Sequence, residues 1–302
     1  MIGRKIKLAR MNPVLVARQI GDFLVKEIVD EGKTGGVIGL SGGVDSTTAA
    51  ALAKKAFGGY NLGNPKVSLE LVGYLLPSKL NDKADEEDGR KVAEGLGIRY
   101  ELINIEPLVE AKARVQPRVM ASKFHRGNQI SELRAGVLHG QAALENKIVI
   151  GTGNRDEDFG VGYYTLFGDG AVRVSPLGML SKRLVREMAV YLRFPDLAYR
   201  VSSPGLEPGQ TAFKDLGYKY ETVVELFANG LEQGFGPEEL IKHPQLLEEA
   251  ERNILEYNET FKCAKFGSAE ELLRNIWKRN NSAKGKARVV SPPMAKISLE
   301  YD

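Results

Sequence analysis

Apolar positions along the first half of the chain change between two spacings. Residues 14–31 carry apolar side chains three and four positions apart, which predicts an amphipathic helix. The run at 36–40 is short and apolar throughout, which is typical of a buried strand, and a helix-forming run follows at 47–56. The same alternation continues. We expect further strands at residues 69–76, 100–105 and 147–150, and further helices at 81–94 and 130–144.

Strands that alternate with helices predict an α/β fold with a doubly wound, mostly parallel sheet. The last third of the chain carries only helical patterns. We therefore expect one domain over residues 1–302, with a helical C-terminal part from about residue 215. Residues 280–288 offer few side chains that can pack, so we expect them to be mobile until a ligand orders them. The C-terminal helices are expected at 181–192, 218–231, 237–241, 246–261 and 269–278.

The turn after the strand at 36–40 has the composition of a phosphate-binding loop. Its glycines let backbone N–H groups face an anion, and the helix that follows adds the positive end of its dipole. Two serine hydroxyls can donate hydrogen bonds, and Asp45 can hold Mg²⁺. The loop lacks the lysine of a Walker A loop and resembles that of the ATP pyrophosphatases, from which pyrophosphate leaves. The residues concerned are Ser41, Gly42, Gly43, Val44, Asp45 and Ser46.

A second glycine-containing turn, residues 151–157, follows the expected strand at 147–150. Ligands of doubly wound sheets lie beyond the carboxyl ends of the strands, so the two turns should face one site. Glu157 is a candidate second magnesium ligand beside Asp45, because Mg²⁺ usually takes one or two carboxylates plus substrate phosphates. Lys182 begins an expected helix, where a cation opposes the helix dipole, so we interpret it as a phosphate contact.

The bulk composition excludes several classes of protein. The 302 residues are 43% hydrophobic and 27% charged, as in an ordinary globular protein. A net charge of +3 gives no argument for nucleic-acid binding. The single cysteine, Cys263, excludes an internal disulfide. The sequence has no apolar run long enough to span a membrane and no secretory signal pattern, so we expect a cytoplasmic protein.

The order of these motifs resembles the ammonia-dependent NAD synthetases, a family of the ATP pyrophosphatase superfamily, over nearly the whole chain. Other ATP pyrophosphatases share the first loop but not the later Gly-Thr-Gly-Asn and Gly-Asp-Gly runs. The matching segments are 40–46, 76–78, 126–128, 151–154 with Glu157, 162–165, 168–170, 176–177 with Lys182, 205–206, Gln210 and 216–217.

The resemblance implies an ATP-dependent amide ligase of NAD biosynthesis. The nicotinate carboxylate of deamido-NAD would attack the α-phosphorus of ATP, and ammonia would then convert the acyl-adenylate to the amide, giving NAD, AMP and pyrophosphate. The family pattern implies Mg²⁺ and a homodimer, assigns catalysis to Asp45 and Lys182, and places Leu76, Thr152 and Ser203 against ATP. Only about 35 residues precede the loop strand, so we expect no glutaminase domain, and either free ammonia or ammonia from a separate protein as the nitrogen source.

The acceptor half departs from the family pattern. The family has an Arg-x-Arg after its Gly-Asn segment; Glu132 stands at the first position and Arg134 keeps the second. Arg173 stands where the family has an aspartate, and Ala212 and Phe213 replace an expected Asp-Glu pair. The acceptor contacts implied by the resemblance are Glu132, Arg134, Asp169, Arg173, Lys286 and Arg288.

The two charge reversals leave alternatives open. A reversed charge beside a phosphate or ribose contact should cost on the order of a few kcal/mol. Either Glu132 and Arg173 compensate one another, or the same chemistry acts on a different carboxylate. A non-catalytic nucleotide-binding paralogue is a third reading, which the intact Asp45, Glu157 and Lys182 oppose.

Overall fold

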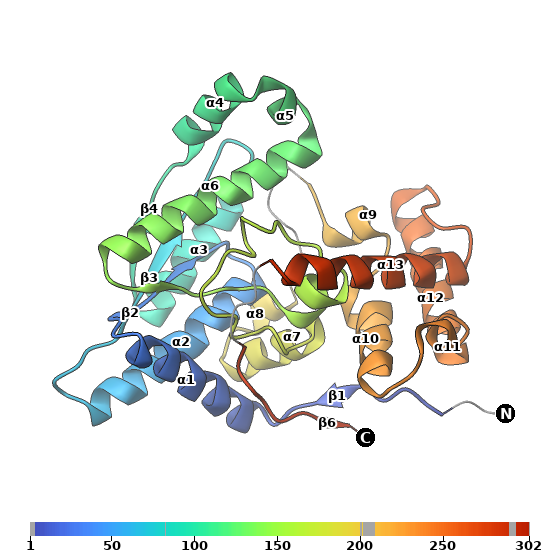
Figure 1. The fold of residues 1–302 in the computed structure, drawn as a ribbon, viewed down its shortest axis with the longest axis horizontal. Helices are drawn as coiled ribbons and strands as arrows, with labels where there is room; N and C mark the ends of the chain where they lie inside the picture. The colour runs from blue at the N-terminus through green and yellow to red at the C-terminus, as the bar shows by residue number, and fades with distance from the viewer. Residues whose placement is uncertain (1–3, 82, 200, 202–208, 290–293, 302) are drawn as a thin grey trace.

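A four-stranded parallel sheet lies at the centre of the larger part of the molecule (Figure 1). The strand order is β4–β3–β2–β5, so the expected parallel sheet is confirmed. The strands are β2 (Gly35–Gly39), β3 (Glu70–Leu75), β4 (Arg99–Leu102) and β5 (Ile148–Val149). This computed structural model describes the chain except for residues 1–3, 82, 200, 202–208, 290–293 and 302.

Helices cover both faces of the sheet, as a doubly wound fold requires. One face packs against α2, which in turn contacts α1, α3 and α7, and the other face packs against α6. The regular burial of Ile20, Leu24 and Ile28 shows that α1 is the amphipathic helix its pattern predicts. The bounds are α1 (Pro13–Asp30), α2 (Val44–Gly63), α3 (Lys83–Leu96), α4 (Glu106–Val115), α5 (Pro117–Ala121), α6 (Lys123–Leu144) and α7 (Lys182–Tyr191).

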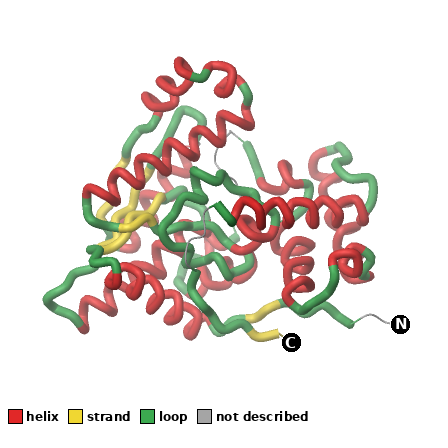
Figure 2. Tube along the Cα trace, viewed as in Figure 1, coloured by secondary structure: helices red, strands yellow, loops and turns green. Residues whose placement is uncertain are grey.

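The C-terminal part of the chain is helical, and Figure 2 shows the sheet strands gathered on one side of the molecule, away from it. Its own core includes Tyr218, Phe227 and Leu272, all buried. The helical elements not yet given are η1 (Asp156–Gly160) and α8 (Pro195–Ala198), which precede this part, and then α9 (Ala212–Leu216), η2 (Tyr220–Val224), α10 (Glu225–Glu232), α11 (Pro237–Ile241), α12 (Pro244–Phe261) and α13 (Ala269–Ala287).

The expectation of a mobile segment at 280–288 is wrong. The last helix, α13, continues through most of it. Ala283 is buried, and its Cβ lies so close to Gly162 that a side chain at the glycine would meet it at 3.1 Å. The polar side chains of this segment pack by hydrogen bonding to backbone rather than by apolar contact, a possibility that the composition alone did not reveal.

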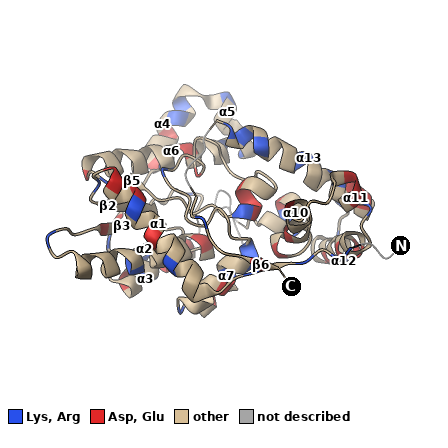
Figure 3. Ribbon diagram, turned by 60° about the horizontal axis from the view of Figure 1, so that its bottom comes forward, with Lys and Arg blue, Asp and Glu red and all other residues tan. Residues whose placement is uncertain are grey.

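The two ends of the chain meet beside the helical part. Strand β1 (Ala9–Arg10) pairs antiparallel with β6 (Glu300–Tyr301). Acidic and basic residues alternate over the helices that Figure 3 shows, in keeping with the small net charge. Among the described residues, no helix combines the length and the apolar character needed to cross a bilayer.

A charge network ties the strands to the end of α6. Glu145, just after α6, accepts a hydrogen bond from Tyr74 of β3 at 2.6 Å and pairs with Arg99 of β4 and with Lys147 at 3.2 Å. Burial alone would raise the pKa of Glu145, but the hydrogen bonds from Arg99, Tyr74 and Lys147 outweigh it and lower the pKa to about 2. The ionised carboxylate therefore holds β3, β4 and the entry to β5 together.

We expect Glu145→Gln to destabilise the protein by about 1–3 kcal/mol at pH 7, because the charged form is favoured by roughly two pKa units over an unfolded value of about 4.3. A lowered pKa contributes stability above the unfolded value and loses it as the pH falls. The difference in unfolding free energy between the variant and the native protein should therefore shrink as the pH falls from about 4.5 to 2. Urea unfolding across this range measures it.

Glu248→Gln is the matched control, because Glu248 pairs with Arg252 on an exposed helical surface. Its unfolding free energy should change by less than about 0.5 kcal/mol. A difference for Glu145→Gln that stays constant down to pH 2 would show that the carboxylate's charge does not supply the stability.

Candidate active site

The loop between β2 and α2 forms a hydroxyl-lined turn. The side chains of Ser41 and Ser46 lie 3.1 Å apart and share a hydrogen bond, and Ser46 Oγ also lies 3.2 Å from the carbonyl of Gly43. The backbone N–H of Gly43 points to Ser41 Oγ at 3.3 Å. Helix α2 starts at Val44, so its positive end faces this turn. The geometry is that of an anion-binding helix terminus.

Gly42 makes the turn possible. Its φ angle is +73°, in the left-handed region that favours glycine, and a Cβ there would lie 2.7 Å from the carbonyl oxygen of Asp85. Helix α3 thus packs directly over the loop. Gly42 itself shapes the turn, while its neighbours Ser41 and Gly43 line the cavity beyond it.

An ion cluster joins the loop to two other elements. The ammonium of Lys182, which is 2% exposed, pairs with Asp45 and, at 2.9 Å, with Glu157. The backbone N–H of Lys182 donates to Asp156 at 2.9 Å, and Arg155 pairs with the same buried Asp156. The carboxylate of Asp156 thus lies against the N-terminus of α7, where its negative charge offsets the unfavourable position of the lysine. Three segments distant in sequence thereby converge on one cation.

The buried charges shift one another's titration. Burial alone would lower the pKa of Lys182, but the carboxylates of Asp45 and Glu157 outweigh it and hold the pKa above its usual value. Burial raises the pKa of Glu157, which Lys182 only partly offsets. Lys182 is therefore a permanent cation, and the carboxylate oxygens around it are poised to accept any positive group that takes its place.

The donor set suits a magnesium ion. Asp45 and Glu157 converge closely enough to share one cation, and both offer the hard oxygen atoms that Mg²⁺ prefers. No group of three or more His, Cys, Asp or Glu side chains suited to a metal lies among the described residues. A site with only these two carboxylates would need oxygen atoms from a bound phosphate to complete its coordination.

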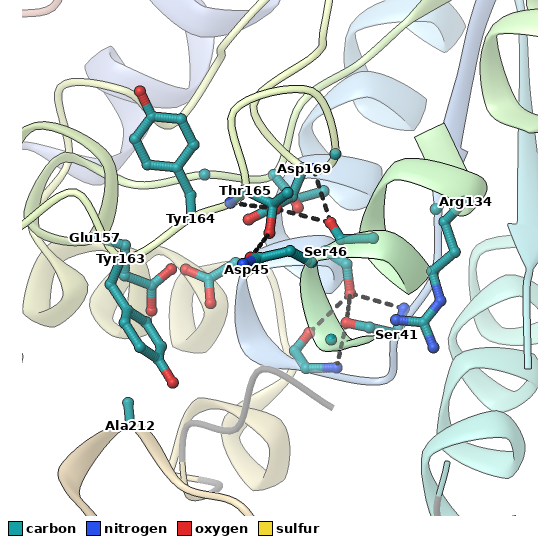
Figure 4. A pocket seen from close by; sticks show the side chains of 18 of the residues that line it. Ser41, Asp45, Ser46, Arg134, Glu157, Tyr163, Tyr164, Thr165, Asp169 and Ala212 are labelled. Carbon is teal, nitrogen blue, oxygen red and sulfur yellow. Dashed lines mark hydrogen bonds between the residues drawn. The ribbon is translucent and has the colours of Figure 1, made fainter. Parts of the chain in front are cut away.

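These groups open into a cavity of about 1370 Å³ at the carboxyl ends of β2 and β5. Figure 4 shows the carboxylates of Asp45 and Glu157 directed toward one another on one side of it, with Arg134 beyond Ser41 on the other. The structure therefore brings nearly all of the expected ATP-side residues together. Those that line the cavity are Ser41, Gly43, Val44, Asp45, Ser46, Leu76, Thr152, Glu157 and Lys182.

Four of the expected acceptor residues also line this cavity. Glu132 accepts a hydrogen bond from Gln129 at 2.7 Å. Arg134 donates to the Leu76 carbonyl at 3.2 Å and to Asn81 at 2.8 Å, and burial lowers its pKa to about 10. Asp169 and Lys286 complete the set.

Asp169 stands in a small hydroxyl network. One of its carboxylate oxygens accepts from Ser131 Oγ at 2.9 Å and from the backbone N–H of Thr165 at 2.8 Å. Burial raises the pKa of Asp169, and these hydrogen bonds partly offset the effect. The network fixes the carboxylate in place at the cavity wall.

Two expected acceptor contacts do not reach the cavity. Arg173 is half exposed and pairs with Glu31 at the end of α1, where its Nε lies 3.1 Å from a carboxylate oxygen. Arg288 is exposed at the end of α13. Both expectations are corrected: neither residue lines the cavity, because Arg173 is held at Glu31 and Arg288 is exposed just after the end of α13. Ser203 lies outside the described residues.

The helix α13 holds the wall that carries Glu157. Three of its side chains donate hydrogen bonds to five backbone carbonyls between residues 159 and 164, so the wall is fixed by a helix that follows it by more than a hundred residues. Asn280 donates to Phe159 (3.1 Å) and Gly160 (3.2 Å), Arg279 to Val161 (3.1 Å), and Lys286 to Gly162 (3.0 Å) and Tyr164.

Sequence reasoning missed two further cavity residues. Asp158 follows Glu157 and lies over Gly153, where a Cβ would meet its carboxylate at 2.0 Å; burial raises its pKa well above the usual value. Tyr163 lies beside Ala212 and donates a hydrogen bond to Asp215. The acidic run at 156–158 was a signal for the first, and the second lies in the matching segment 162–165 without having been given a role.

Comparison with known proteins gives consistent findings. The family model described as NAD synthase matches residues 16–263. The NH3-dependent NAD(+) synthetase of Hyperthermus butylicus is 39% identical over 242 residues, which are 80% of this chain and 84% of the relative. This relative belongs to the family that the motifs resemble.

Two solved structures are also similar. That of NMN synthetase from Francisella tularensis has a TM-score of 0.72 and 29% identity, covering 94% of this chain and 99% of the other. That of NH3-dependent NAD synthetase from Campylobacter jejuni, in complex with the nitrate ion, has a TM-score of 0.64 and 21% identity, covering 92% and 97%. The second supports the fold alone, and it agrees with the doubly wound arrangement.

We expect Lys182→Met to destabilise the ligand-free protein by about 2 kcal/mol, because it leaves Asp45 and Glu157 facing each other without their shared cation. The value is below the range for fully buried pairs, since both carboxylates retain some access to the cavity. The double variant Lys182→Met/Asp45→Asn should regain part of this loss. Urea unfolding of the single and double variants measures both effects.

Lys55→Met serves as the control, because Lys55 is exposed and bonds only to the hydroxyl of Tyr191 among the side chains described. Its unfolding free energy should change by no more than about 0.5 kcal/mol. If the double variant were no more stable than Lys182→Met, carboxylate repulsion would not be the cause of the loss.

Proposed function

This chain belongs to the NAD synthase family, and from that premise we propose how its residues carry out the reaction. Its activity is that of an ammonia-dependent NAD synthetase, a ligase that uses ATP. The observation that supports the residue assignment best is the convergence of Asp45, Glu157 and Lys182 beside the Ser41–Ser46 loop. A non-catalytic nucleotide-binding protein would have no need of this buried charge cluster.

The loop and Lys182 would bind the pyrophosphate part of ATP. Ser41, Ser46 and the backbone N–H groups at the start of α2 offer donors, and Lys182 offers a cation that needs no proton transfer to act. As the bond between the α- and β-phosphates breaks, these groups stabilise the negative charge on the leaving pyrophosphate. Leu76 and Thr152 line the cavity beside them and would position the nucleotide.

Mg²⁺ held by Asp45 and Glu157, with phosphate oxygens completing its coordination, would neutralise charge on the breaking α–β bond. For the ion to bind there, the ammonium of Lys182 must leave the two carboxylates, which places it where it can contact the phosphates. The chain supplies no nucleophile in this scheme. Its contribution is to hold the carboxylate of the acceptor against the α-phosphorus and to exclude water from the acyl-adenylate.

We further propose that residues 1–302 act as one catalytic domain in the cytoplasm, where ATP is available. The described residues supply both the phosphate loop and the cavity wall that faces it, which supports a single functional unit. Ammonia would enter from solvent and attack the carbonyl carbon of the acyl-adenylate, with AMP as the leaving group.

A second candidate acceptor is a mononucleotide, nicotinate mononucleotide, in place of deamido-NAD. Three cations at positions that the family pattern assigns to the acceptor already have protein partners: Arg134 at Leu76 and Asn81, Lys286 at two backbone carbonyls, and Arg173 at Glu31. Glu132 adds a negative charge to the same wall. An acceptor with fewer phosphates would suit this wall better. The similarity to the NMN synthetase of Francisella tularensis supports the same direction.

We expect the purified protein to form NAD from deamido-NAD, ATP and ammonium, with AMP and pyrophosphate as the other products. Asp45→Asn should lower kcat at least about 100-fold, because it removes a charge that acts on the breaking bond. Glu132→Arg should raise kcat/KM for deamido-NAD relative to nicotinate mononucleotide by about tenfold, since it replaces repulsion of the additional phosphate with attraction. Product chromatography with both acceptors measures these ratios.

Absence of NAD with active, folded protein would contradict the assignment to deamido-NAD. If the native protein had a higher kcat/KM for nicotinate mononucleotide than for deamido-NAD, the second candidate would be established instead. Glu248→Gln, far from the cavity on an exposed helix, is the control and should change neither ratio.

We also propose that the protein is a homodimer whose interface includes the start of α6. Phe124 is 75% exposed although it is large and apolar, and it lines the rim of the cavity; Val115 nearby is 78% exposed. Figure 1 shows α4, α5 and the adjoining end of α6 projecting from the body of the molecule. A second copy that covers this projection would bury both side chains and close one side of the cavity.

We expect sedimentation equilibrium to show a dimer, and Phe124→Asp to weaken self-association by at least about tenfold, because a charge would enter an apolar interface. Leu62→Asp is the matched control, since Leu62 is equally exposed at the far end of α2 and should leave association unchanged. A native protein that sediments only as a monomer at all concentrations would refute the dimer.

A further inference from the structure

Asn154 lies at the centre of the ion cluster without reaching the cavity. Its side chain is fully buried, and it forms hydrogen bonds to two elements of the site, α2 and η1. The amide nitrogen donates to a carboxylate oxygen of Asp45 at 2.9 Å. The amide oxygen accepts from the backbone N–H groups of Asp156 and Glu157, both at 3.1 Å.

These hydrogen bonds connect the carboxylate of Asp45 to the backbone of Glu157, the residue whose carboxylate shares the same cation. Asp45 lies in the first turn of α2, and Glu157 lies in η1, more than a hundred residues later. Lys182 also bridges them, but its ammonium occupies the position between the two carboxylates and would have to move for another cation to bind there. The planar amide of Asn154 is short, buried and held at both ends. It can therefore keep the two carboxylates in register after Lys182 has left.

The donation to Asp45 has a further consequence for its geometry. A carboxylate oxygen that accepts from the amide of Asn154 is fixed in direction, so the second oxygen is aimed at the position between Asp45 and Glu157, where Lys182 now lies. Partners of this kind orient metal-binding carboxylates and contribute to metal affinity without touching the metal. A pure capping residue of η1 would need only the amide oxygen.

We propose that Asn154 is a positioning residue that sets the separation and direction of Asp45 and Glu157 for a divalent cation bound together with nucleotide. The proposal rests on the proposed function in one respect, namely that these two carboxylates hold the cation. Asn154 acts through Asp45 and contacts neither the cation nor the substrate.

The experiment measures Mn²⁺ binding, a spectroscopic probe for the magnesium site, in the presence of a non-hydrolysable ATP analogue. The decisive variant is Asn154→Ser. Serine keeps an oxygen that can cap the backbone N–H groups of Asp156 and Glu157 but is too short to reach Asp45. We expect its Mn²⁺ dissociation constant to rise about 10- to 100-fold, the range for losing the partner of a metal ligand. Binding of the analogue without metal should stay within about twofold of the native value.

Asn253 provides a matched control in the same fold. It is also a buried asparagine, 2% exposed, that accepts from a backbone N–H group, at Lys219, and donates to a side chain, Thr222 Oγ1, at 2.9 Å. Asn253→Ser should lower thermal stability to a similar degree but leave Mn²⁺ affinity unchanged. Asn154→Leu, which removes both functions of the amide at similar volume, should weaken Mn²⁺ binding at least as much as Asn154→Ser.

The outcomes separate this proposal from the function on which it rests. If Asp45→Asn and Glu157→Gln weaken Mn²⁺ binding but Asn154→Ser does not, Asn154 is only a structural cap and the proposal is wrong. If Mn²⁺ binding is unchanged in Asp45→Asn, Glu157→Gln, Asn154→Ser and Asn154→Leu alike, the carboxylates do not hold the cation and the proposed function of the pair fails. Equal losses in Asn154→Ser and Asn253→Ser would show a general effect of folding and would also overturn the proposal.

Discussion

The sharing of one buried ammonium by two carboxylates is the interaction on which the rest of this site depends. Lys182, Asp45 and Glu157 come from the starts of α7 and α2 and from η1. Taking three charges out of water is costly unless each finds its partner in good geometry. The arrangement therefore requires all three elements to be placed accurately, and the surrounding structure supplies that placement from several directions at once.

Two independent supports meet at this cluster. The parallel sheet sets the position of the loop and of the second glycine turn, because β2 and β5 are adjacent and end at the same edge. The helical C-terminal part sets the position of the wall that carries Glu157, because Asn280, Arg279 and Lys286 of α13 bond to its backbone carbonyls. The C-terminal helices thus contribute to the active site without providing most of its chemical groups.

Local patterns predicted the parts of the molecule that are determined locally. The strands, the amphipathic helix α1 and the hydroxyl-rich loop follow from periodicity and from glycine placement. The convergence of Asp45 and Glu157 follows from the rule for parallel sheets, whereas Lys182 was singled out by its position at a helix start. The extension of α13 could not be predicted in this way, because it is stabilised by hydrogen bonds to residues more than a hundred positions away. Arg173 shows the same limit: sequence alignment gave its position in a motif, whereas its side-chain direction depends on pairing with Glu31.

The contrast between the two halves of the cavity has a physical basis in how each is built. The ATP half faces a part of the ligand that does not vary, a chain of phosphates. Its groups are a helix terminus, a lysine and two carboxylates in fixed geometry.

The acceptor half is built from α6 and from the loop at 162–170. The cations at this half are already engaged: Lys286 donates to backbone carbonyls, and Arg134 donates to Leu76 and Asn81. A cation that bonds to the protein stabilises the shape of a pocket but gives less attraction to an incoming phosphate than an unengaged one, because the ligand must displace an existing hydrogen bond. The acceptor half is therefore selective through shape and through the negative charge of Glu132 more than through attraction. Under the proposed function, a change of acceptor can proceed by moving a few charges on that wall, while the cluster around Lys182, to which we assign the ATP chemistry, stays as it is.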